Sequence, residues 1–194
     1  MSNIILTGDT SGTLNIAAPL VAGTNTQTLV AATGTLAPLI SGTAVASTSG
    51  TSIDFTGIPS WVKRVTVMFQ GVSTNGVSYI QIQLGTSGGI EASSYLGTAS
   101  TVAASSVGSD NISTGFWVRS AAATGVRHGQ FVISLINPST NAWVASGVLG
   151  YSDSTITTIT GGSKSLSGTL DRVRVTTQNG TDAFDAGTIN ILYE

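Results

Sequence analysis

A long segment of this chain carries no charge, and this limits the folds that the chain can adopt. From Thr10 to Ile53 the sequence contains no charged side chain, and over the whole chain charged residues make up only 8%. Hydroxyl groups supply much of the polarity instead. Thr, Val and Ile are stiff at χ1 and suit a pleated sheet better than a helix, while Gly and Ser favour turns. The composition therefore predicts an all-β protein.

A folded chain is favoured over a disordered one. Disordered segments combine low hydrophobicity with high net charge, whereas 41% of this chain is hydrophobic and its mean hydropathy is +0.32. Its 194 residues are enough to bury a core. We therefore expect a packed β domain.

The charge and the apolar pattern argue against binding to nucleic acid, a membrane span and a secretory signal. The net charge of −2 provides no basic footprint for nucleic acid, and Arg172 and Arg174 are interpreted as one solvated strand face. No run reaches the ~18–20 apolar residues of a membrane span, and the segment 1–9 lacks the features of a secretory signal. The absence of cysteine suits a protein that meets oxidising surroundings. A chain that lacks a secretory signal is made and kept in the cytosol, yet this chain suits oxidising surroundings outside a cell. We therefore expect a virion protein, which leaves the cell by lysis.

Two regions are predicted, with a division after residue 43. In residues 1–43 a Ser/Thr-Gly-Thr motif recurs, for example at 11–14 and 33–36, between short alternating runs at 13–16 and 26–30. Strands this short bury too little apolar area to offset chain entropy. The first region is therefore expected to be an extended, strand-rich attachment or shaft segment, stabilised by two sister chains or another virion protein.

Residues 44–194 show the period-two alternation of antiparallel strands. Turns are predicted at Asn75-Gly76, 137–141, Gly161-Gly162 and Asn179-Gly180. About nine strands at regular spacing predict a sandwich head that resembles a jelly roll. The strands are expected at 61–69, 79–84, 95–103, 115–119, 128–136, 143–151, 156–165, 169–177 and 187–193.

Two motifs suggest catalysis, and both have simpler readings. The segment 85–89 matches G-x-S-x-G with Ser87 as nucleophile, and Asp110 and His128 follow in hydrolase order. That elbow must precede a helix, whereas a further strand is expected here. The segments 60–63 and 109–111 match S-x-x-K and S-D-N, but the first opens a strand and K-T-G is missing. No enzyme is predicted.

No cofactor or metal site is predicted either. His128 is the only histidine, and a metal site needs several converging ligands. Asp182 and Asp185 could bind Ca²⁺ together with backbone carbonyls, but solvated loop acids are the simpler interpretation. Among the large aromatic side chains, Trp61 is expected to pack beneath a sheet. Trp143 and Tyr151 flank a strand next to turns, and they are the candidates for an exposed surface that contacts a host glycan.

Several segments resemble a known class of proteins. Thr7–Leu14, Val21–Leu29 and Ala31–Thr35 are similar to the threonine-rich segments of tailed-phage fibre and minor structural proteins. Ser49–Arg64 resembles the opening of a C-terminal domain found in many phage and prophage tail or virion proteins. That domain often ends in a segment like Ala186–Glu194.

The resemblance implies a virion protein, usually a homotrimer, with an N-terminal attachment segment, a β-rich head and no catalytic residues to carry over. We therefore expect a short trimeric fibre or spike, or a capsid decoration protein, whose partners are its own copies and another virion protein. A receptor-binding module for host surface glycan is the alternative. An esterase or depolymerase that uses Ser87 is a remote third possibility.

Overall fold

The computed structural model describes residues 3–7, 13–17, 37–120, 122–123 and 125–194. The chain divides into two compact units between Leu36 and Ala37. This division precedes the one expected after residue 43, because the short strands at 40–41 and 45–46 pair with the C-terminal strand and so belong to the head.

The first unit contains an antiparallel strand pair. β1 (Asn3–Thr7) pairs with β2 (Thr13–Ala17), with Ile5 opposite Asn15. The strand expected at 13–16 is therefore confirmed. The run expected at 26–30 and the motif at 33–36 lie outside the described residues.

The second unit consists of strands and turns, without a helix among its described residues. Most of the expected strands are present within a few residues of their predicted limits. The strands are β3 (Ile40–Ser41), β4 (Val45–Ala46), β5 (Ser52–Thr56), β6 (Arg64–Thr74), β7 (Ile80–Thr86), β8 (Gly89–Glu91), β9 (Leu96–Ala103), β10 (Ser106–Asn111), β11 (Phe116–Val118), β12 (Arg127–Asn137), β13 (Ala142–Tyr151), β14 (Ile156–Ser165), β15 (Arg172–Thr177) and β16 (Phe184–Tyr193).

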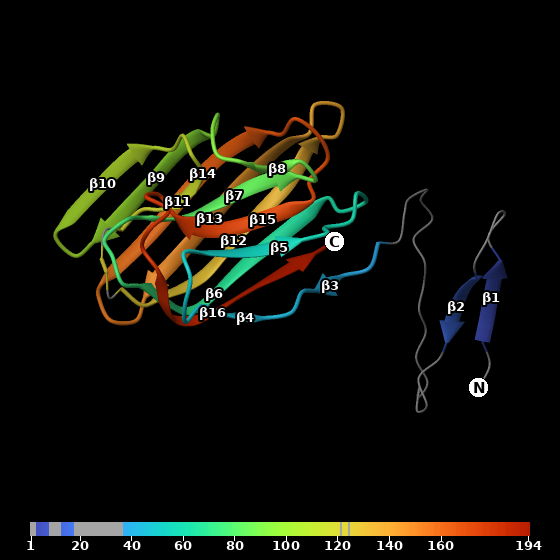
Figure 1. Cartoon of the computed structure of the whole chain (residues 1–194), viewed down its shortest axis with the longest axis horizontal. Helices are drawn as coiled ribbons and strands as arrows, with labels where there is room; N and C mark the ends of the chain where they lie inside the picture. The colour runs from blue at the N-terminus through green and yellow to red at the C-terminus, as the bar shows by residue number, and fades with distance from the viewer. Residues whose placement is uncertain (1–2, 8–12, 18–36, 121, 124) are drawn as a thin grey trace. The chain divides into compact units, whose positions relative to one another are not determined.

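These strands form two antiparallel sheets that lie in two layers (Figure 1). The large sheet has the order β10-β9-β14-β13-β12-β6-β16-β3, with β4 also paired to β16. The small sheet has the order β11-β7-β15-β5, with β8 paired to β7. The chain crosses between the sheets repeatedly, so distant strands such as β5 and β15 become neighbours. The predicted all-β fold with an antiparallel sandwich is confirmed.

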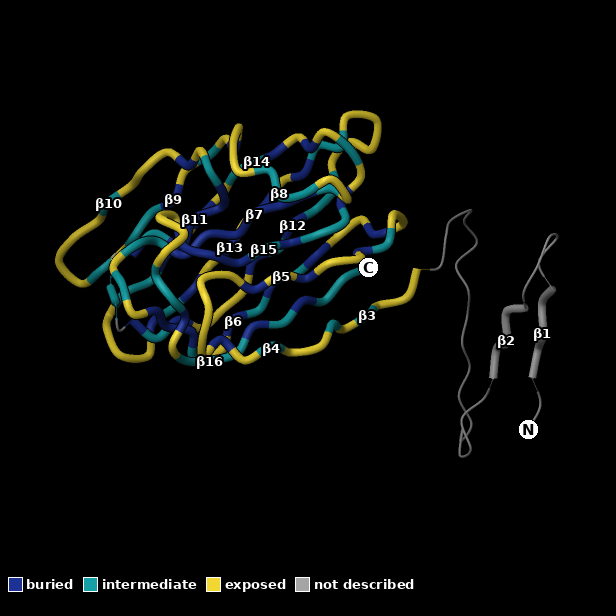
Figure 2. Tube along the Cα trace, in the orientation of Figure 1, coloured by how far each residue is buried: buried dark blue, intermediate teal, exposed yellow. Residues whose placement is uncertain are grey.

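The core lies between the two sheets, where alternating strand residues meet (Figure 2). On β6, Val65, Val67 and Phe69 are buried as expected, and on β13 the buried residues include Trp143 and Leu149. The small sheet contributes the inward side chains of β7 and β15. Because each sheet has one buried face, a slip of one residue would expose the whole apolar set.

Two predicted turns are wrong. Asn75-Gly76 does not close a hairpin, because β6 belongs to the large sheet and β7 to the small one. Gly161-Gly162 lies within β14. A Cβ at Gly162 would overlap the backbone of Leu96, whereas a Cβ at Gly161 would meet no other atom. The turns at 137–141 and Asn179-Gly180 are confirmed.

A fully buried guanidinium supports the segment between β11 and β12. Arg127 donates to the Tyr151 hydroxyl at 2.7 Å and to the carbonyls of Gly125 at 2.8 Å, Ala122 at 2.9 Å and Ser120 at 3.3 Å. No carboxylate of the described residues pairs with it. Arg127 therefore acts as a clamp on backbone oxygens.

Candidate functional site

The structure does not assemble the hydrolase-like residues. Ser87 lies in the turn between β7 and β8, and no helix follows it. Asp110 on β10 accepts a hydrogen bond from Arg119 Nε at 2.6 Å. His128 on β12 accepts from Gly71 N at 3.3 Å and contacts the Ser152 hydroxyl at 3.2 Å. Among the described residues, no hydrogen bond joins any two of these three side chains, so they form no triad.

The S-x-x-K and S-D-N segments are also separated by the fold. Ser60 and Lys63 lie in the connection that leads into β6, whereas Ser109 lies on β10 at the far edge of the large sheet. The motif that should open a helix precedes a strand, as expected from the sequence.

The two loop aspartates are used in hydrogen bonds. Asp182 accepts from Asn179 Nδ2 at 2.6 Å and from Ser78 N at 2.9 Å, and these bonds lower the pKa of its carboxyl. Asp185 accepts from the Ser73 hydroxyl. Within the part of the chain that the structure describes, no three His, Cys, Asp or Glu side chains cluster as metal ligands would.

The prediction of an exposed Trp143 and Tyr151 is wrong. Their side chains are only 2% and 8% exposed, because both belong to the face of β13 that packs on the core. Trp61, expected beneath a sheet, is instead 37% exposed, and its ring centroid lies 6.1 Å from that of Tyr193. Trp61 lies in the proline-containing connection before β6. It is therefore not part of the alternating strand pattern that would have buried its side chain.

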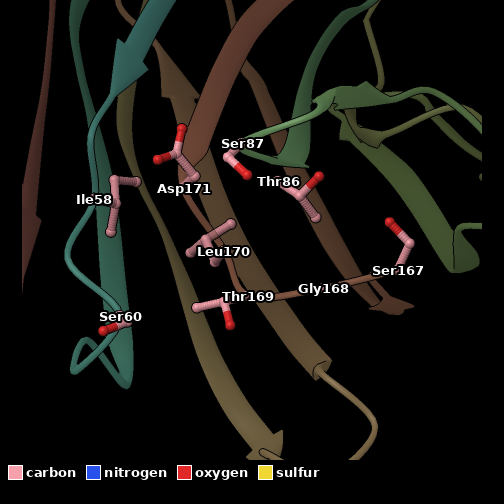
Figure 3. A pocket seen from close by; sticks show the side chains of 9 residues that line it. All are labelled: Ile58, Ser60, Thr86, Ser87, Ser167, Gly168, Thr169, Leu170 and Asp171. Carbon is pink, nitrogen blue, oxygen red and sulfur yellow. The ribbon is translucent and has the colours of Figure 1, made fainter.

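A surface cleft lies where three connections meet beside the small sheet. Its volume is about 440 Å³. The connections run from β5 to β6, from β7 to β8 and from β14 to β15, and Figure 3 shows their side chains around the cleft. The lining consists of Ile58, Ser60, Thr86, Ser87, Ser167, Gly168, Thr169, Leu170 and Asp171.

Backbone hydrogen bonds hold these connections together. Asp171 N donates to Gly85 O at 3.0 Å, and Ile58 N donates to Asp171 O at 2.9 Å. Arg172 donates to the Asp171 carboxylate at 3.0 Å and to Ser87 O at 3.1 Å. The cleft is therefore built from fixed segments that present hydroxyl groups and one carboxylate.

A buried donor lies next to this cleft. Trp143 Nε1 is buried and donates to no acceptor among the described residues. It borders a smaller cavity of about 80 Å³, which shares Ser60, Thr169 and Leu170 with the cleft. A buried polar group without a partner is uncommon and commonly marks a site filled by water or a ligand. The hydroxyl groups and the carboxylate that line the cleft can form hydrogen bonds with a polar ligand.

An ion pair fixes the end of β14 near the cleft. Lys164, 5% exposed, contacts the Glu91 carboxylate at 2.6 Å and lies 5.6 Å from the centre of the Tyr95 ring. Ser167 donates to Glu91 through its amide at 2.8 Å and its hydroxyl at 2.6 Å. Burial raises the pKa of the Glu91 carboxyl, but the hydrogen bonds from Lys164 and Ser167 outweigh burial and lower it.

Replacing Glu91 with Gln is expected to reduce the free energy of unfolding by about 1–3 kcal/mol at pH 7, because Lys164 is left buried without its carboxylate. The pKa of Glu91 is lowered on folding. Its stabilisation is therefore present above the unfolded value of about 4.3 and is lost as the pH falls through the folded value. Urea unfolding between pH 3 and pH 7 checks both effects.

The control is Asp110→Asn, which breaks an ion pair with Arg119 whose carboxylate partner is 46% exposed and should change stability by about 0–1 kcal/mol. A Glu91→Gln deficit that stayed constant as the pH fell would contradict the assignment.

Comparison of the chain with protein-family models, curated proteins and solved structures finds no match. Among the described residues, no helix has both the length and the apolar character needed to cross a membrane.

Proposed function

We propose that this chain is a non-enzymatic structural component of a bacteriophage particle, a short trimeric fibre, spike or capsid decoration. The observation that carries this proposal is the division into a sandwich head, residues 37–194, and a separate N-terminal unit, residues 1–36. From Thr10 to Leu36 the N-terminal unit contains no charge. A charge-free segment can be buried against sister chains or another virion protein without desolvating ions.

The entry into the head supports the same proposal. β3 and β4, the first strands of the head, pair with its last strand, β16, at one edge of the large sheet. Covered sheet edges also discourage unwanted strand pairing.

The proposal is tested on particles released by lysis from the phage that encodes the chain. After density-gradient purification, the chain should co-purify with the major capsid or tail proteins at a fixed ratio and resist removal by high salt, because charge does not hold it. Recovery of the chain only in the soluble fraction would overturn the proposal.

A second function, binding of host surface glycan, is favoured by the cleft. Its hydroxyl groups and the Asp171 carboxylate match the donors and acceptors of a sugar. Trp61 follows Ser60 of the lining in the sequence, and its side chain is 37% exposed. This candidate replaces the exposed pair Trp143 and Tyr151 expected from the sequence.

Replacing Trp61 with Ala is expected to weaken binding to surface polysaccharide by roughly 2–10-fold, the equivalent of one lost aromatic contact. Trp61→Phe keeps an aromatic face and serves as the matched control. Binding of the full chain to whole host cells is the measurement. Equal binding by the wild type, Trp61→Ala and an unrelated β-sandwich would remove the glycan proposal.

A further inference from the structure

Five neighbouring strands of the large sheet, β12, β13, β14, β9 and β10, present an outer face turned away from the small sheet (Figure 1). Residues opposite one another in the register share a face, so the outer face can be written as four rows across the strands. We call these rows the neutral face. They are His128, Gly150, Thr157, Val102 and Val107; Gln130, Val148, Ile159, Ser100 and Ser109; Val132, Ser146, Gly161, Thr98 and Asn111; and Ser134, Val144, Ser163 and Leu96.

The neutral face contains no Asp, Glu, Lys or Arg. The same strands do carry charged side chains, but these lie on the opposite face. Arg127 is paired with buried Tyr151, and Lys164 with buried Trp143. An antiparallel sheet with one solvated face is usually polar or charged on that face, so here the usual placement of charge is reversed.

The outer face of the small sheet shows the contrast. There Arg174 and Asp54 form a hydrogen-bonded ion pair at 2.7 Å, and Asp54 raises the pKa of the Arg174 guanidinium. Exposed Thr56 lies opposite Arg172 on the same sheet. The absence of charge is therefore specific to the neutral face and not common to both surfaces.

Apolar side chains are exposed on the neutral face. Val148 and Ile159 are opposite each other near its middle and are 54% and 47% exposed. Val107 and Leu96 at its margin are 73% and 70% exposed. Several exposed apolar side chains gathered on one uncharged face indicate an interaction site.

We propose that the neutral face packs against a second copy of this chain. A charged partner would leave its ions desolvated and unpaired against this face, whereas another neutral face brings no charge and no like-charge repulsion. Five strands about 4.8 Å apart and four rows about 6.8 Å apart cover about 650 Å². Two copies would bury about 1,300 Å², within the range of about 1,200–2,000 Å² typical of a specific interface.

This inference goes beyond the proposed function, because it concerns a two-fold contact between heads, which is distinct from the three-fold grouping through the N-terminal segments and requires no particle. The chain has no cysteine, so single cysteines report contacts without background. In the purified full-length chain, Ile159→Cys treated with a bismaleimide should give at least about tenfold more covalent dimer than Thr56→Cys, whose site lies on the charged outer face.

A second change tests the chemistry of the contact. Adding Val148→Lys to Ile159→Cys should reduce the cross-linked dimer at least about tenfold, because lysines of two copies would meet. Val148→Thr, which adds no charge, should leave the yield unchanged. Near-ultraviolet circular dichroism verifies that each variant is folded. Equal yields from Ile159→Cys and Thr56→Cys, or no loss with Val148→Lys, would overturn the inference, whatever the outcome of the particle experiment.

Discussion

Replacing Arg127 with Met is expected to lower the free energy of unfolding by about 3–5 kcal/mol at pH 7. Its side chain is fully buried and donates to three backbone carbonyls and the Tyr151 hydroxyl. Methionine fills a similar volume but donates nothing, so several buried acceptors lose their partner at about 1–3 kcal/mol each. Urea unfolding measures the change.

The matched control is Arg174→Met, which removes an arginine from the exposed ion pair with Asp54 and should change stability by about 0–1 kcal/mol. In the Arg127→Met variant, limited proteolysis should cut the segment between β11 and β12 faster than in the wild type. A loss of stability no greater than that of Arg174→Met would contradict the role of Arg127 as a clamp.

Gly187→Ala is expected to destabilise the head by about 2–5 kcal/mol, the sum of a strained backbone and an overlap. Gly187 on β16 has φ +95°, a conformation that L side chains rarely adopt. A Cβ there would lie 2.4 Å from Gly71 O and 2.6 Å from Val72 N. Both are backbone atoms of the neighbouring strand β6, so β6 and β16 would have to separate. Thermal or urea unfolding checks this.

Gly180→Ala separates the two contributions. Gly180 also has a positive φ, of +69°, but nothing lies within 4 Å of its Cβ position. Its substitution should therefore bring only the backbone strain, about 1 kcal/mol. Similar losses at the two glycines would show that the close approach of β6 and β16 contributes little.

The strands could be predicted because their alternation is regular. The expected limits 156–165 match β14, and the expected strand at 143–151 differs from β13 by one residue. Asn75-Gly76 was misleading because a turn signal describes local geometry and does not say whether the next strand joins the same sheet. The Gly161-Gly162 pair was misleading because a glycine in a strand can serve close packing.

The burial of Trp143 and Tyr151 shows that the alternation of a strand does not predict which of its two faces is buried. Both faces of β13 are apolar, with Trp143 and Leu149 on one side and Val144 and Val148 on the other. Periodicity separates the two faces but does not say which one packs on the core. For the same reason, the sequence alone does not predict the neutral face, which is defined by the register of five strands.

The cleft could not be predicted for a different reason. Its lining comes from three connections that are distant in the sequence, and their meeting depends on the strand order. Ser60 and Ser87 stand out in the sequence only because each matches a catalytic motif. Thr169 and Asp171 match none. Trp61 could have been noticed as a tryptophan that follows a proline, outside any alternating run.

Electron cryo-microscopy of the intact particle tests whether the chain is a structural component of the virion. We expect head-shaped density, matching the sandwich of residues 37–194, at symmetry-related sites on the capsid or tail, in groups of three copies attached through their N-terminal segments. Particles that lack this density, while the chain stays soluble in the lysate, would contradict the claim that it is a structural component of the virion.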